Sequence, residues 1–132
     1  VTGHFDTLPL LFSFIVFTWV SGFDILYALQ DETFDRENKL QSIPVLLGRK
    51  NAMLVSNMLH VITASVVIYI GFAYMQSYTY YAGAALFTGL LFYQHTLVKP
   101  HDISKVNLAF GTTNGIASIL YASFVILFIV LQ

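Results

Sequence analysis

The chain has 132 residues, of which 57% are hydrophobic and only 10% are charged. A soluble domain usually carries about a quarter charged residues, so this composition excludes an ordinary soluble globule. The formal net charge of −1 gives no general attraction to nucleic acid, which we do not expect as a partner. The absence of cysteine excludes disulfides and thiolate metal sites. The sequence therefore indicates an integral, multi-pass membrane protein in contact with the lipid bilayer.

The first predicted membrane helix covers residues 8–29, which are almost wholly apolar as far as Asp24. Pro9 stands where the first turn of a helix tolerates proline. The next segment, residues 30–50, is rich in charged residues and is predicted to be a water-facing connection. Within it, Pro44 and Gly48 are typical of helix ends, and Asn51 is a plausible cap for the following helix.

Three further apolar stretches follow, each close to the roughly 20 residues that cross a bilayer. They cover residues 52–75, 78–98 and 108–131. Only Gln76 and Ser77 separate the first two of these, so a tight hairpin must join them, whereas the polar residues 99–107 precede the last. We expect an all-α, polytopic transmembrane bundle of four helices, with residues 1–132 forming part of one domain.

The basic residues are distributed asymmetrically. Four of the six lie in residues 30–50, and the other two are Lys99 and Lys105 in the second polar segment. If four helices cross the membrane alternately, these two segments lie on the same side. The positive-inside tendency then places both segments in the cytoplasm. A bacterial inner membrane is the expected location.

Three carboxylates have a spacing that suggests chemistry. At about 100° per residue, Asp24, Asp31 and Asp35 fall within about 40° of one another on a continued helix, with Tyr27 at the edge of the stripe. Like charges at this spacing repel, and a charge near the hydrocarbon boundary needs a partner. Oxygen ligands without Cys or His suit Mg²⁺, which often binds together with a substrate phosphate. The spacing alone favours a simpler interpretation, in which these carboxylates are the solvated end of a membrane helix.

Two sequence blocks carry a family resemblance. Residues 24–31, Asp-Ile-Leu-Tyr-Ala-Leu-Gln-Asp, with Phe34-Asp35 and residues 40–44, resemble the second aspartate-rich motif of the UbiA prenyltransferases. They are most similar to the 4-hydroxybenzoate polyprenyltransferase branch. Residues 93–110, followed by Thr113-Asn114-Gly115, also resemble that branch. Two blocks in the family's order make a chance match improbable.

The resemblance implies a nine-helix fold, of which this chain matches helices six to nine, in the carboxyl-terminal half. It implies transfer of a polyprenyl group from its diphosphate to an aromatic acid such as 4-hydroxybenzoate, with Mg²⁺, in ubiquinone or menaquinone biosynthesis. The family's other motif, of the Asn-Asp-x-x-Asp type, does not occur in this chain. We therefore expect the chain to require an amino-terminal half of the same protein and to be inactive alone.

The resemblance also implies roles for individual residues. Asp31 and Asp35 would hold Mg²⁺, Asp24 and Tyr27 would act in catalysis, and the substrate would be bound by Arg36, Lys39 and Lys105. Simpler interpretations remain open for two of them, a structural hydrogen-bonding role for Asp24 and an interfacial position for Tyr27. Lys39 departs from the family, which usually has glycine there.

Two other classes of membrane protein fit the sequence less well. A CDP-alcohol phosphotransferase would show an Asp-Gly-x-x-Ala-Arg string, which this sequence lacks. The main alternative is a polytopic transporter or channel subunit with a cytoplasmic cation-binding loop. Such a protein predicts charged residues deep in several spans, whereas only Asp24 lies even near one.

Overall fold

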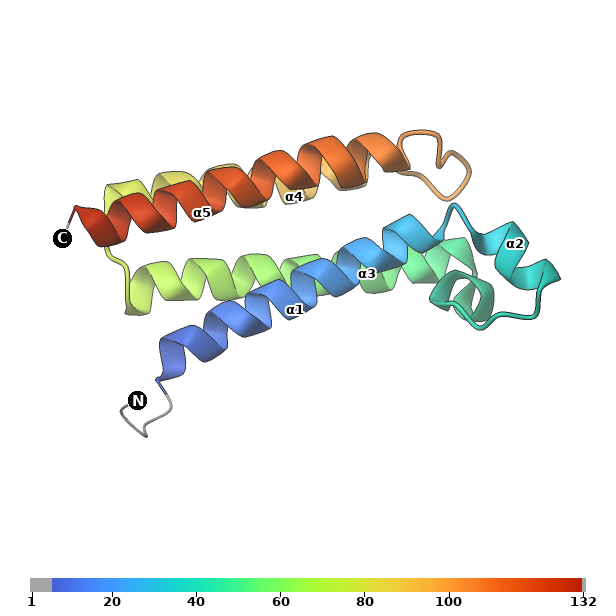
Figure 1. Cartoon of the computed structure of the whole chain (residues 1–132), viewed down its shortest axis with the longest axis horizontal. Coiled ribbons are helices and arrows are strands. Elements are labelled where there is room, and N and C mark those ends of the chain that lie inside the picture. The colour runs from blue at the N-terminus through green and yellow to red at the C-terminus, as the bar shows by residue number, and fades with distance from the viewer. Residues whose placement is uncertain (1–5, 132) are drawn as a thin grey trace.

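A computed structural model describes residues 6–131 and confirms the predicted all-α bundle. Four long helices form two layers, in which α1 packs mainly on α3 and α4 mainly on α5 (Figure 1). The elements in chain order are α1 (Thr7–Ala28), α2 (Glu32–Glu37), α3 (Ile43–Ala73), α4 (Tyr78–Leu97), the π-helical turn η1 (Leu108–Asn114) and α5 (Gly115–Val130). The short α2 and the loop before η1 lie at one end of the bundle (Figure 1).

Three helices within the described residues are long and apolar enough to cross a membrane. They are Thr7–Ala28, Ile43–Ala73 and the continuous helical stretch Leu108–Val130. The fourth long helix, α4, has 20 residues but is not among these three, because tyrosines near both its ends and the adjacent Gln94 and His95 lower its hydropathy. The bundle is therefore that of an integral membrane protein.

The chain does not continue as one helix from Asp24 to Asp35, and this expectation was wrong. Helix α1 ends at Ala28, where Leu29 N–H donates to the carbonyl of Leu26 and Asp31 N–H donates to that of Ala28. These i→i−3 bonds tighten the end of the helix, and a new helix begins at Glu32. Leu29 is completely buried in this turn, so core packing outweighs continuation of the helix.

Helix α3 contains a sharp break at Gly48. This residue has φ 75° and ψ 158°, a conformation that is almost restricted to glycine. The predicted helix end at Gly48 is thus confirmed, and the long membrane-crossing part starts directly after it. The predicted cap at Asn51 was wrong, because Asn51 lies inside the helix and its side-chain amide donates to the carbonyl of Leu47 at 3.1 Å.

Helices α1 and α3 are joined by polar contacts along their length. The hydroxyls of Thr18 and Thr63 are 2.7 Å apart, and the Ser56 hydroxyl donates to the carbonyl of Gly22 at 2.7 Å. Hydroxyl groups and small residues at such an interface let two membrane helices approach closely. These contacts fix α1 against α3, and α1 carries Asp24 at its far end.

A buried imidazole connects the two layers of the bundle. His60 Nε2 is 3.1 Å from the carbonyl of Trp19, which can only accept, so this nitrogen carries the proton. His60 Nδ1 must then accept from His95 Nε2 at 2.7 Å and from the Gln94 amide at 3.2 Å. This network was not predicted, because its two histidines lie 35 residues apart on different helices.

Gly22 is required by this close approach. A Cβ at Gly22 would lie 2.4 Å from His60 Nε2, whereas a Cβ at Gly89 in α4 would meet no atom within 4 Å. We expect Gly22→Ala to lower the free energy of unfolding by about 2 kcal/mol, because overpacking a well-packed interface costs 1–3 kcal/mol. Chemical unfolding in detergent measures the effect. Gly89→Ala is the matched control and should leave stability equal or slightly raised; equal losses in both variants would contradict the proposed clash.

Candidate active site at the polar end of the bundle

The two polar segments predicted to share one side of the membrane lie together at one end of the bundle (Figure 1). The side-chain amide of Gln30 donates to the side-chain oxygen Oδ1 of Asn107 at 3.0 Å, although these residues are 77 positions apart. Beneath them an apolar cluster packs the end of α1 against the start of the long part of α3, the loop after α4 and η1. Its members are Ile25, Leu26, Leu29, Ala52, Met53, Val98, Val106 and Ala109. The shared end is confirmed, and its cytoplasmic location stays a prediction.

Helix α2 presents Asp31 and Asp35 one turn apart. Asp31 is the residue before the first turn, and its carbonyl accepts from Asp35 N–H at 2.8 Å. Asp31 is exposed and Asp35 is half-buried. Within residues 6–131 neither carboxylate forms a hydrogen bond or an ion pair, and Asp31 makes no side-chain cap. Both carboxylates are therefore available to a cation.

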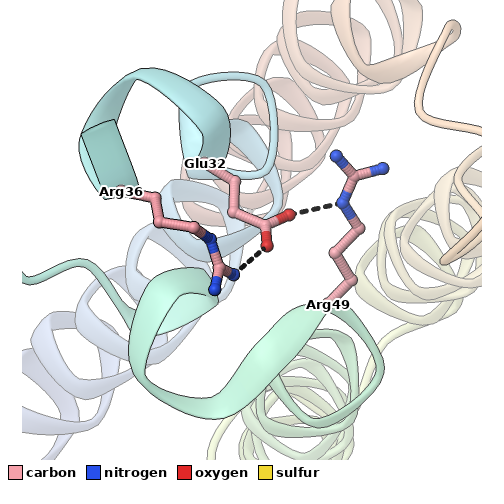
Figure 2. Close-up of polar contacts among 3 residues, drawn as sticks. All are labelled: Glu32, Arg36 and Arg49. Carbon is pink, nitrogen blue, oxygen red and sulfur yellow. Dashed lines mark hydrogen bonds and ion pairs between the residues drawn. The ribbon is translucent and has the colours of Figure 1, made fainter.

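Glu32, which lies between these two aspartates in the sequence, is paired with basic residues. Glu32 is buried and lies between two guanidinium groups, Arg36 Nη2 at 2.8 Å and Arg49 Nε at 2.5 Å (Figure 2). The hydrogen bond from Arg49 is the main cause that lowers the pKa of Glu32 from its usual 4.5, burial opposes it, and Arg36 adds to the lowering. This arrangement, which we call the Glu32 clasp, attaches α2 to α3.

The Glu32 clasp was not predicted from the sequence. One half of it was readable, because Glu32 and Arg36 have the i,i+4 spacing of a helical ion pair. The contact with Arg49 could not be predicted from spacing, because Arg49 lies 17 residues further along the chain, in the next helix. Arg36, predicted to bind substrate, is 61% exposed while it pairs with Glu32, so it also faces solvent.

Lys39 follows α2 with φ 55°, in the left-handed region. Leu40 N–H donates to the Asp35 carbonyl at 2.8 Å and Lys39 N–H to the Arg36 carbonyl at 3.3 Å, which is the hydrogen-bond pattern of a Schellman motif. Glycine is the usual residue at the left-handed position of this motif. This geometry explains why glycine suits the position, and it leaves the Lys39 side chain exposed beside α2.

Asp24 lines an open groove of about 440 Å³ on the side of α1 and α3. We call it the Asp24 groove, and its lining residues are Phe17, Ser21, Asp24, Ile25, Ala28, Ile43, Val55 and Leu59. Among the described residues that line it, Asp24 alone is charged, and it is exposed. A single carboxylate in an otherwise apolar groove suits a ligand that has one polar end and a hydrocarbon body.

Tyr27 and Lys105 lie at the same end but outside the Asp24 groove. The Tyr27 ring packs on Phe110 of η1, with ring centroids 4.6 Å apart, and is 41% exposed. Lys105 is exposed, in a loop where the Asp102 carboxylate accepts from Ser104 N–H. Hydrogen bonds with Ser104 are the main cause that lowers the pKa of Asp102, and the charges of His101 and Lys105 add to it. No group of three or more His, Cys, Asp or Glu side chains within residues 6–131 is arranged to hold a metal.

These features define a helical membrane protein whose polar end presents paired carboxylates next to an apolar groove. A profile described as the UbiA prenyltransferase family matches residues 1–130, and the chain belongs to this family. It is similar to 4-hydroxybenzoate octaprenyltransferases from Tolumonas auensis (23% identical over 122 residues), Nitrosomonas europaea (25% over 121) and Nitrosospira multiformis (26% over 112). These alignments cover 92%, 92% and 85% of the chain, but only 42%, 41% and 38% of the relatives. No solved structure matches it.

Proposed function

We propose that the protein containing this chain transfers a polyprenyl group from its diphosphate to an aromatic acid such as 4-hydroxybenzoate, in ubiquinone or menaquinone biosynthesis. Membership of the UbiA family and the names of the three relatives support this reaction class. The observation that carries the proposal is that Asp31 and Asp35 have no partner in the described chain, while Glu32 between them is neutralised by two arginines. The two aspartates thus keep their charge for a ligand.

Asp31 and Asp35 fit a hard cation such as Mg²⁺, to which they would supply two carboxylates one helical turn apart. Oxygen ligands one helical turn apart are the type that Mg²⁺ uses, with water and substrate phosphate completing its shell. When bound, Mg²⁺ would neutralise the negative charge that develops on the diphosphate leaving group. In this proposal Asp31 and Asp35 hold the cation, and Arg36, Lys39 and Lys105 supply positive charge to the diphosphate from the same end of the bundle.

The remaining parts of the site are assigned from their position. The Asp24 groove would hold the prenyl chain near the polar end, with Asp24 positioned to orient the aromatic acid or accept its proton. The Tyr27 ring, supported by Phe110, could face the allylic cation. Because the chain spans about 40% of the relatives it matches, we place the second set of carboxylates and the other walls of the cavity on the rest of the protein.

A direct assay tests the proposed reaction. The full-length protein, purified in detergent with a polyprenyl diphosphate, 4-hydroxybenzoate and Mg²⁺, should form a ring-prenylated acid detectable by chromatography and mass spectrometry. EDTA should abolish the product and added Mg²⁺ should restore it. This chain alone should give no product, since one set of carboxylates cannot balance the charge of a diphosphate. A well-folded full-length protein that prenylates no aromatic acid would contradict the proposal.

A further inference from the structure

A second groove lies between α3 and α4, on the side of α3 away from the Asp24 groove. At about 100° per residue, the side of α3 that carries Lys50 and Asn57 is almost opposite the side that carries Leu59 of the Asp24 groove. The polar part of this second groove has a volume of about 320 Å³. Its lining residues are Lys50, Asn51, Met53, Leu54, Asn57, His95, Val98, Lys99 and Pro100. None of these is a residue of the proposed active site.

The polar part of the α3–α4 groove is basic. Lys50 comes from α3 and Lys99 from the loop after α4, and no carboxylate lines the groove. Within residues 6–131 neither lysine forms an ion pair. The nearest acidic residue along the chain, Asp102, is exposed and accepts from Ser104 N–H. Two unpaired lysines with two asparagines supply charge and hydrogen-bond donors for an anion.

The groove continues into an apolar part of about 280 Å³. Asn57 and His95 line both parts. The deeper walls are Val61, Ala64, Leu91 and Phe92, together with His60, whose ring nitrogens are already bonded to Trp19 and His95. At 1.5 Å per residue, Lys50 and Ala64 lie about 21 Å apart along α3. One leaflet, with its headgroups, is about 20–22 Å thick, half of the 40–45 Å of a bilayer. The α3–α4 groove therefore has a basic mouth and an apolar body, and its length matches one leaflet.

We propose that the α3–α4 groove binds an anionic phospholipid. The phosphate lies against Lys50 and Lys99 at the polar end, and one acyl chain lies along Val61 and Phe92. Basic pockets between membrane helices at one interface are suited to anionic headgroups, because each nearby lysine adds favourable electrostatic energy in a region of low dielectric constant. This site is separate from the proposed prenyl transfer and stands whether or not that reaction is confirmed.

Lipid binding to the purified protein tests this proposal by native mass spectrometry in detergent. Phosphatidylglycerol and phosphatidylcholine with identical acyl chains are compared. We expect the double variant Lys50→Gln/Lys99→Gln to bind phosphatidylglycerol about tenfold more weakly, while phosphatidylcholine binding is unchanged. The conservative variant Lys50→Arg/Lys99→Arg should retain the preference for phosphatidylglycerol. Equal loss of both lipids in the Gln variant, or no loss of either, would overturn the proposal.

A second variant tests the apolar part with both lysines in place. Val61 is 51% exposed, so a larger side chain at this position does not disturb the core. The Val61→Trp variant should therefore fold, and its indole ring should fill the apolar part of the groove. We expect it to weaken binding of long-chain phosphatidylglycerol and to leave a short-chain analogue unaffected. Two competitors identify the source of the phosphate. Displacement of the lipid by inorganic phosphate would show a simple anion site, and stronger binding of polyprenyl diphosphate would show a substrate site; either result would overturn the assignment to a phospholipid.

Discussion

Replacing Asp31 or Asp35 by asparagine in the full-length protein is expected to reduce prenyl transfer by about 100-fold or more, because each substitution removes one charged ligand of a hard cation. The amide keeps the shape of the side chain, so insertion and folding should be unchanged. Neither aspartate forms an ion pair or a side-chain hydrogen bond within the described residues, so no internal contact is lost. Initial rates across a range of Mg²⁺ concentrations measure the effect.

Glu37→Gln is the matched control for these variants. Glu37 is an exposed carboxylate in the same short helix, and it also forms no ion pair within residues 6–131. Its loss removes the same charge from α2, so a general electrostatic effect would lower activity in all three variants. We expect Glu37→Gln to keep nearly full activity. Near-normal rates in both aspartate variants would return Asp31 and Asp35 to the interpretation as the solvated end of a membrane helix.

Disrupting the Glu32 clasp is expected to lower stability by about 2 kcal/mol in Arg49→Gln. Removal of one partner leaves the Glu32 carboxylate, whose side chain is 12% exposed, only partly compensated. Arg36→Gln is the control, because the Arg36 side chain is 61% exposed and its pair with Glu32 is an i,i+4 surface pair worth about 0.5 kcal/mol. Equilibrium unfolding of the wild type and both variants gives the comparison. Equal effects of the two substitutions would show that the clasp is not held mainly by Arg49.

The same clasp gives a pH dependence with a defined sign. The pKa of Glu32 is lowered in the folded protein from its ordinary value of 4.5, chiefly by the hydrogen bond from Arg49. Its contribution to stability is therefore complete above about pH 4.5 and is lost as the pH falls through the lower folded-state pKa. Glu32→Gln should remove this part of the acid sensitivity. If the variant and the wild type lose stability in parallel on acidification, Glu32 is not the group responsible.

A stable clasp also matters for the proposed reaction, because α2 carries both proposed ligands. Arg49 stands directly after the Gly48 break, at the start of the long membrane-crossing part of α3. Through Glu32 it fixes α2 to that helix (Figure 2). In Arg49→Gln we therefore expect a higher Mg²⁺ concentration for half-maximal activity, with less change in the rate at saturating Mg²⁺. A change in the Mg²⁺ requirement without a matching change in the maximal rate would indicate that Arg49 positions α2 and takes no direct part in the reaction.

The sequence by itself determined the class of protein and most of its helices. Long apolar stretches and few charges require membrane helices, and their lengths set most helix bounds to within a few residues. The exceptions are the start of α3 at Ile43, predicted at residue 52, and the short helix α2, which was predicted to be part of a connection. The common location of the two polar segments followed from alternate crossing. Gly48 marked a break because only glycine readily adopts its backbone conformation. Asp31 and Asp35 were identified from the family motif, and their i,i+4 spacing within one helical turn is a local property of the chain.

The tertiary structure decided how the charged residues are used. Where α1 ends at Ala28, Leu29 is buried in an apolar cluster with Val98 and Val106, which are distant in sequence. Glu32 differs from its acidic neighbours because it pairs with Arg49, which lies 17 residues away in the sequence. The Gln30 side chain is hydrogen-bonded to Asn107, which lies 77 residues away. Hydropathy and helical spacing describe only a window of neighbouring residues. Burial and ion pairing depend on which distant segments pack together. In this bundle packing neutralises Glu32, and among residues 6–131 it leaves Asp31 and Asp35 without partners.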